Sequence, residues 1–116
     1  MAEAIATTTI HLADVRDRVP GEYVGRRMPG RPGSPLGNPF KVAQHGTAAA
    51  LNLYRLWLRD ALEEPGSAQR TEIDRLLAIL RARGSLTLLC WCKGSETCHA
   101  AIIRDALMRR MGDRNG

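Results

Sequence analysis

The sequence lacks any apolar run near the roughly 18 residues that a membrane-spanning helix requires. Its first residues, Met-Ala-Glu-Ala-Ile-Ala, also lack the positive start and the apolar stretch of a secretory signal peptide. With 116 residues, the chain has room for one compact core. We therefore expect a single cytoplasmic domain over residues 1–116 that makes no use of a membrane.

Cysteine is scarce, and the three residues all lie between Cys90 and Cys98. An odd number within one short segment does not suit a disulfide framework, which spreads its cysteines over a small fold. The sequence also contains no internal repeat and no G-x-x-x-x-G-K-[ST] phosphate loop, which excludes a repeat array and a P-loop nucleotide enzyme. The cysteines are therefore interpreted as parts of one site.

Basic charge is present in excess and is unevenly placed. Seventeen Lys and Arg residues against twelve Asp and Glu residues give a formal net charge of +5. Six basic and two acidic residues fall between residues 16 and 41, so this segment carries most of the excess. The same segment holds five of the six prolines and several glycines, which predicts a loop over residues 26–40. A basic loop favours an anionic ligand such as a nucleotide or the phosphates of a nucleic acid.

Hydrophobic periodicity predicts alternating strands and helices. Strands, the last of them buried on both faces, are expected over residues 7–15, 22–25 and 85–91. Helices are expected over residues 47–64, 71–83 and 98–111. Thr47 is expected as the N-cap of the first helix and Gly84 as the C-terminal stop of the second. This order predicts a compact Rossmann-like α/β domain with a small, mostly parallel sheet and flanking helices.

Four potential ligand side chains follow the last predicted strand, in the sequence Cys90-Trp-Cys92-Lys-Gly-Ser-Glu-Thr-Cys98-His99. In a parallel α/β sheet, the crevice between the carboxyl end of a strand and the N-terminus of the next helix attracts anions. A helix N-terminus lowers the pKa of a nearby thiol, and histidine can act as an acid, a base or a ligand. We therefore expect Cys98 and His99 to be catalytic and Cys90 to contact the ligand.

Two other interpretations of this cluster remain open. Cys90, Cys92, Cys98 and His99 form a permitted tetrahedral zinc set, although the adjacent Cys98 and His99 would point in different directions at a helix start. Alternatively the cluster is structural, with Cys90 packed as an apolar residue, Cys92 at the strand end and His99 bonded to a loop carbonyl. No metal is favoured, and zinc is kept as the alternative cofactor.

The glycine and proline loop supplies the second half of the predicted site. Glycine lets backbone N–H groups approach a phosphate closely, and arginine binds phosphate through a fixed fork of donors. We expect phosphate or ligand contacts from Gly25, Arg26, Ser34 and Gly37. Asn38 is expected on the sugar or base, and it joins Cys98 and His99 in the predicted catalytic set. The alternative is a solvated loop whose arginines only keep the protein soluble.

Three motifs together resemble a known family: Tyr23-Val-Gly-Arg26, Gly33-Ser-Pro-Leu-Gly-Asn-Pro-Phe40, and Leu89-Cys-Trp-Cys92 followed by Cys98-His99. This combination resembles domain-of-unknown-function family 4326, found in bacteria and phages, over roughly residues 10–107. A weaker similarity is to family 488, in which an acidic residue commonly takes the place of Cys92. That similarity would make Cys92 replaceable and a four-ligand metal site less favoured. Neither resemblance carries over an activity.

The two predicted halves are best explained if they meet over the carboxyl edge of the sheet. The leading hypothesis is a pocket for a nucleotide, or for the phosphate-bearing part of a nucleic acid, with transfer or hydrolysis at a glycosidic or phosphate bond. The alternative is a non-catalytic nucleic-acid-binding module stabilised by zinc. In that case the phosphates would be bound by Arg26, Arg27, Arg31, Arg109 and Arg110. A partner-binding protein without a ligand is the third hypothesis.

Overall fold

Three parallel strands form the sheet in the part of the chain that the structure describes. The computed structural model describes residues 8–27, 30–40, 42–90 and 99–113. The strands are β1 (Thr9–Asp14), β2 (Glu22–Tyr23) and β3 (Ser85–Cys90). Their order is β1-β3-β2, and β3 pairs in parallel with both neighbours. The predicted α/β class is therefore confirmed, and the described sheet is wholly rather than mostly parallel.

Four α-helices accompany the sheet. They are α1 (Val42–His45), α2 (Thr47–Leu62), α3 (Ala68–Arg83) and α4 (His99–Asp113), and a short 3-10 turn, η1 (Val15–Asp17), follows β1. The first two strands do not pair with each other, because β3 arrives late in the chain and is inserted between them. Since all three strands run in the same direction, their carboxyl ends at Asp14, Tyr23 and Cys90 meet at one edge.

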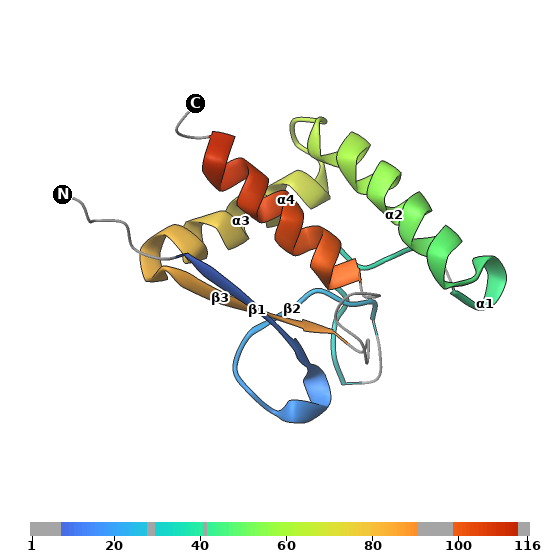
Figure 1. Cartoon of the computed structure of the whole chain (residues 1–116), viewed down its shortest axis with the longest axis horizontal. Helices are drawn as coiled ribbons and strands as arrows, with labels where there is room; N and C mark the ends of the chain where they lie inside the picture. The colour runs from blue at the N-terminus through green and yellow to red at the C-terminus, as the bar shows by residue number, and fades with distance from the viewer. Residues whose placement is uncertain (1–7, 28–29, 41, 91–98, 114–116) are drawn as a thin grey trace.

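The long helices lie on one side of the sheet (Figure 1). Leu86, Leu88 and Cys90 alternate along β3 and belong to the core beneath these helices. On the opposite face, His11 is exposed and Thr87 is only partly buried. The expectation of a strand buried on both faces therefore holds for the second half of β3, where Leu88, Leu89 and Cys90 are all buried, and is wrong for its start, where Ser85 is exposed.

Helix α2 confirms the predicted apolar stripe but not the predicted cap. Tyr54, Leu58 and Leu62 are buried at helical spacing. Thr47 is the first helical residue, and the N-cap is Gly46, which makes no side-chain hydrogen bond. Gly46 joins α2 to the short helix α1, which the sequence pattern did not predict. Its φ is 81°, a conformation that glycine adopts without strain because it has no Cβ atom.

Helix α3 begins three residues earlier than predicted because Ser67 caps it. The Ser67 Oγ accepts a hydrogen bond from the backbone N–H of Arg70 at 3.0 Å and donates one to the carbonyl oxygen of Ala61 at 2.7 Å. The predicted stop at Gly84 is confirmed, with φ of 75° and an N–H that donates to the Leu80 oxygen. Ser67 therefore fixes the turn between α2 and α3 as well as the start of α3.

Helix α4 begins directly at His99 and buries Ile103 and Leu107, as predicted. The predicted strand residue Trp91 and the candidate ligands Cys92 and Cys98 lie outside the described residues. Within the ranges given above, no helix is long and apolar enough to cross a membrane.

Candidate functional site

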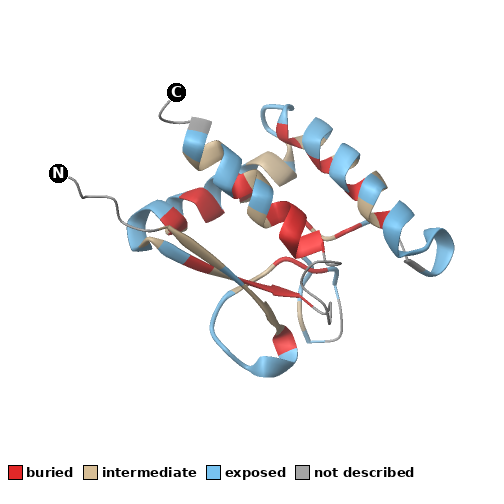
Figure 2. Ribbon diagram, in the orientation of Figure 1, coloured by how far each residue is buried: buried red, intermediate tan, exposed pale blue. Residues whose placement is uncertain are grey.

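The carboxyl end of β2 is joined directly to the start of α4. The Val24 N–H donates to the carbonyl oxygen of Leu89 at 2.9 Å, which extends the pairing of β2 with β3 by one residue. The Val24 carbonyl oxygen lies 2.8 Å from Nε2 of His99. Val24 is completely buried and His99 is 8% exposed, so this contact is shielded from water. The first turn of α4 appears buried in Figure 2.

The partner of His99 determines where its proton lies. A carbonyl oxygen can only accept, so Nε2 donates, and the lone pair of the neutral ring lies on Nδ1. Burial lowers the pKa of His99, and the positive charge of Arg26 also lowers it, whereas the hydrogen bond to Val24 acts in the opposite direction. His99 is therefore held as a neutral, oriented imidazole at neutral pH.

Tyr54 of α2 connects the loop to His99. Its hydroxyl donates to the carbonyl oxygen of Leu36 at 2.6 Å, and its ring packs edge-on against the His99 ring, with 5.4 Å between the centroids. Burial raises the pKa of Tyr54 well above its ordinary value, so the hydroxyl remains a donor. The sequence reasoning did not include Tyr54 in the site. A tyrosine on the buried face of a helix, whose hydroxyl needs an acceptor, is the signal that could have found it.

The glycine and proline loop folds back on the end of β2. The Gly25 oxygen accepts from the N–H of Ser34 at 2.9 Å, and the Ser34 oxygen accepts from the N–H of Gly37 at 2.9 Å. A Cβ atom at Gly37 would lie 3.0 Å from the Gly25 oxygen and 3.1 Å from the Arg26 nitrogen. The structure thus brings together the predicted residues Gly25, Ser34 and Gly37, and glycine at position 37 permits a close approach of loop to loop.

Asn38 has one satisfied and one unsatisfied side-chain group. Its Oδ1 accepts from the backbone N–H of Phe40 at 2.8 Å, which forms a turn stabilised by the side chain. Because that partner is a donor, the other amide atom is the nitrogen. Asn38 is 8% exposed, and among the residues that the structure describes this nitrogen has no hydrogen-bond partner. A buried donor of this kind requires an explanation, and a bound ligand is one.

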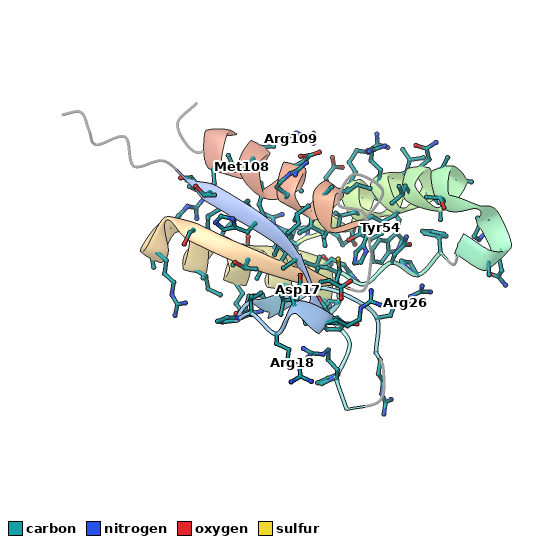
Figure 3. All side chains as sticks on the ribbon, turned by 60° about the horizontal axis from the view of Figure 1, so that its bottom comes forward. Asp17, Arg18, Arg26, Tyr54, Met108 and Arg109 are labelled. Atoms are coloured by element: carbon teal, nitrogen blue, oxygen red, sulfur yellow. The ribbon has the colours of Figure 1, made fainter. Side chains whose placement is uncertain are left out.

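Arginine side chains surround the same end of the sheet. Arg26 and Arg27 are exposed, and the Arg31 guanidinium lies 5.1 Å from the centre of the Tyr23 ring. The Tyr23 hydroxyl donates to the Arg26 carbonyl oxygen at 2.5 Å, and burial raises the Tyr23 pKa while the charge of Arg31 acts against that rise. Figure 3 shows the side chains of Arg26 and Tyr54 at the same end of the sheet. The basic rim therefore borders the loop and the His99 region.

The cysteines divide between described and undescribed residues. Cys90 is buried at the end of β3, opposite Asp14 of β1, and its Sγ lies 3.9 Å from the Ala13 oxygen. Cys92 and Cys98, predicted as zinc ligands or as a catalytic thiol, lie outside the described residues. Within the described chain, no group of three or more His, Cys, Asp or Glu side chains is arranged to hold a metal. The predicted zinc set therefore stays a prediction.

Comparison with known proteins gives one family. The model of the domain of unknown function DUF4326 matches residues 10–109, which cover β1 from its second residue onward, β2, β3, the loop and the Cys-His segment. Neither the curated proteins nor the solved structures gave a match.

Proposed function

Since the chain belongs to the DUF4326 family of domains of unknown function, we propose its function from its own chemistry. It binds a nucleotide, or the phosphate-bearing part of a nucleic acid, at the carboxyl edge of the sheet. The observation that carries this proposal is the junction of Val24 and Gly25. Gly25 is hydrogen-bonded to the loop through Ser34, and Val24 is hydrogen-bonded to the start of α4 through His99.

Charge and hydrogen bonding at this junction support an anionic ligand with a polar head. The exposed guanidinium of Arg26 can take a phosphate through two parallel donors. The carboxyl edge of a parallel sheet, next to a helix N-terminus, is the usual place for phosphate groups. The amide nitrogen of Asn38, which has no partner within the described part of the chain, supplies a donor for an acceptor on the sugar or base. Arg26 and Asn38 are thus assigned to different parts of the ligand.

The neutral imidazole of His99 supports a hydrolytic or transfer reaction as the activity of this site. In hydrolysis, water forms a bond to the phosphorus or the anomeric carbon while the bond to the leaving group breaks. His99 accepts the proton that the water loses, and the leaving group departs with the electron pair. In transfer, an acceptor hydroxyl replaces the water. Cys98 directly precedes His99 in the sequence and stays the second residue of the predicted catalytic pair.

Titration calorimetry with a panel of purine and pyrimidine nucleoside mono-, di- and triphosphates tests the binding. We expect Arg26→Ala to weaken the affinity of the best ligand about tenfold or more, because a charge-assisted hydrogen bond contributes about 1.5–3 kcal/mol. Asn38→Asp keeps the Oδ1 acceptor of the turn, replaces the donor by an acceptor and should weaken binding similarly. Arg81→Ala on α3, an exposed arginine remote from the loop, is the matched control and should bind like the wild type.

Two results would contradict this function. One is the absence of binding by every nucleotide and by a short single-stranded oligonucleotide. The other is unchanged affinity in Arg26→Ala and Asn38→Asp when circular dichroism indicates that both variants are folded.

A zinc-stabilised nucleic-acid-binding module is the second candidate, and the orientation of His99 favours it. A histidine that binds metal usually donates its other ring N–H to a carbonyl or carboxylate. His99 donates from Nε2 to Val24, so Nδ1 is the ring nitrogen that carries the lone pair a metal would need. This candidate predicts about one zinc per purified chain, unfolding by a chelator, and nucleic-acid affinity that falls steeply with salt. Metal analysis of the calorimetry sample separates the two functions.

A further inference from the structure

A second concave surface lies between α2 and α4, away from the loop. The groove has a volume of about 400 Å³ and takes its walls from residues 55–62 of α2, the following residue Glu63, and residues 102–110 of α4. The two helices run side by side (Figure 1), and the groove starts at Arg55, directly after Tyr54, and at Ile102, three residues after His99. The proposed nucleotide site uses none of its residues.

The base of the groove is apolar and its rims are basic. Apolar side chains come from both helices, namely Leu56, Leu58, Leu62, Ile102 and Ala106. Four arginines line the same groove: Arg55 and Arg59 from α2, and Arg109 and Arg110 from α4. Leu56 is 50% exposed, and Met108, beside Arg109, is 42% exposed. Figure 3 shows Met108 and Arg109 near the end of α4, away from the sheet.

We propose that this groove binds an acidic amphipathic helix of a partner protein. A helix in a groove places an apolar stripe on the base and charged residues against the rims. The eight residues from Arg55 to Leu62 span about 10 Å, so the partner presents two helical turns with apolar residues at i, i+3 or i+4, and i+7. Glu or Asp beside that stripe pairs with the arginines on either wall.

Charge and composition favour this occupant over two others. Among the described lining residues, two are acidic, Glu63 and Asp105, against four arginines. A two-fold dimer would place two such positive grooves against each other. Single-stranded nucleic acid is bound by aromatic side chains on which the bases stack, and the described residues that line the groove include no aromatic side chain. The apolar base and the excess of arginine together match an acidic helix.

Fluorescence anisotropy with designed peptides tests the proposal. The probes are three labelled 16-residue peptides with Leu at helical spacing in different registers and Glu at the flanking positions, and matched peptides have Lys in place of Glu. We expect at least one Glu peptide to bind and its Lys counterpart to bind at least tenfold more weakly. Raising NaCl from 0.1 to 0.4 M should weaken the Glu peptide several-fold, because exposed ion pairs are screened.

Matched variants assign the binding to the groove. Arg59→Glu with Arg109→Glu should weaken the Glu peptide at least tenfold, because both side chains are exposed on opposite walls. Leu56→Gln should weaken it through lost apolar contact. Arg81→Glu on α3 makes the same charge change outside the groove and should alter the affinity less than twofold. Circular dichroism and melting temperature verify that each variant is folded.

Several outcomes would overturn the proposal. They are the absence of binding by every Glu peptide at 1 mM, equal affinity of the Glu and Lys peptides, and unchanged peptide affinity in the double variant Arg59→Glu, Arg109→Glu. Displacement of the bound peptide by a twelve-nucleotide single-stranded DNA would assign the groove to nucleic acid instead. A dimer in sedimentation equilibrium that Leu56→Gln dissociates would assign it to a second copy. None of these outcomes affects the nucleotide site.

Discussion

At the scale of single residues, buried polar side chains hold the candidate site together. Among the described residues, Asn38 and His99 are the polar side chains in the buried class, and Tyr54 adds a buried hydroxyl. Each is bonded to the backbone of a loop or strand end: Phe40, Val24 and Leu36, respectively. Because a buried polar group without a partner is costly, these side chains and the backbone groups they meet fix each other in place.

Replacing Tyr54 by Phe removes the donor to a completely buried residue, Leu36. We expect the free energy of unfolding to fall by about 1–3 kcal/mol, because the Leu36 carbonyl is left buried without a partner. Tyr23→Phe is the matched control, since it removes a hydroxyl bonded to the exposed Arg26 carbonyl, which water can satisfy. Urea unfolding of both variants measures the difference. Equal losses in the two variants would show that burial of the Leu36 bond does not matter.

At the scale of elements, caps and neighbours determine where each helix begins. Ser67 caps α3 and is bonded to the end of α2, whereas Thr47, the residue with the stronger sequence signal for α2, lies inside the helix. A cap depends on the direction from which the chain enters the helix. Before α2 the chain leaves α1 through Gly46, whose positive φ sets that direction.

Ser67→Ala and Thr47→Ala should therefore differ in stability. We expect Ser67→Ala to lower the free energy of unfolding by about 1–2 kcal/mol, because it removes the N-cap of α3. Thr47→Ala should change it by less than about 0.7 kcal/mol and in the stabilising direction, because alanine favours a helix more than threonine does. Thermal and urea unfolding measure both. A loss in Thr47→Ala as large as that in Ser67→Ala would restore the cap predicted from the sequence.

At the scale of the whole molecule, β3 and α4, which come late in the chain, join the elements formed by its first residues. β3 pairs with both β1 and β2, and His99 then ties α4 to the residue after β2 across 75 positions of sequence. Because His99 joins two parts of the fold, we expect its charge state to affect the free energy of unfolding of the domain.

Stability should depend on pH through His99. Its folded pKa is lowered from the ordinary value of 6.5, first by burial and then by the charge of Arg26, so the unfolded chain binds the proton more readily. The contribution of His99 to the free energy of unfolding is therefore complete above about pH 6.5 and is lost as the pH falls through the folded pKa. We expect the free energy of unfolding of the wild type to decline between pH 7 and 5.

Two variants isolate this effect. His99→Gln keeps a donor for Val24 and should remove the decline that comes from the histidine. His11→Gln replaces an exposed histidine of β1 and should leave the decline unchanged. Urea unfolding at intervals between pH 5 and 7 gives the slopes, and a wild-type slope that persists in His99→Gln would remove His99 as its cause.

Local patterns predicted much of the secondary structure. The apolar spacing of Tyr54, Leu58 and Leu62 predicted the buried face of α2, and Gly84 predicted the end of α3. These features are decided within a few residues, by helical periodicity and by the backbone freedom of glycine. The order of elements also predicted a parallel α/β fold, because parallel strands need long crossovers.

Within the candidate site, the loop residues and His99 were predicted, but several of their roles were not. Gly37 approaches the Gly25 backbone, and Asn38 closes its own turn through Oδ1. Tyr54 was missed because nothing in its own helix marks Leu36, 18 residues away, as the acceptor of its hydroxyl. A residue type indicates which bonds are possible, and only the fold determines which partner is near enough to form them.

The sequence by itself determined the parallel α/β class, the basic glycine and proline loop, and the family to which residues 10–109 belong. Only the tertiary structure decided the strand order, the bond between His99 and Val24, and the arginine-rimmed groove between α2 and α4. The physical reason is the separation along the chain over which each interaction acts. Propensities and caps act over a few neighbouring residues, whereas these contacts join residues far apart in sequence that meet only when the helices pack on the sheet.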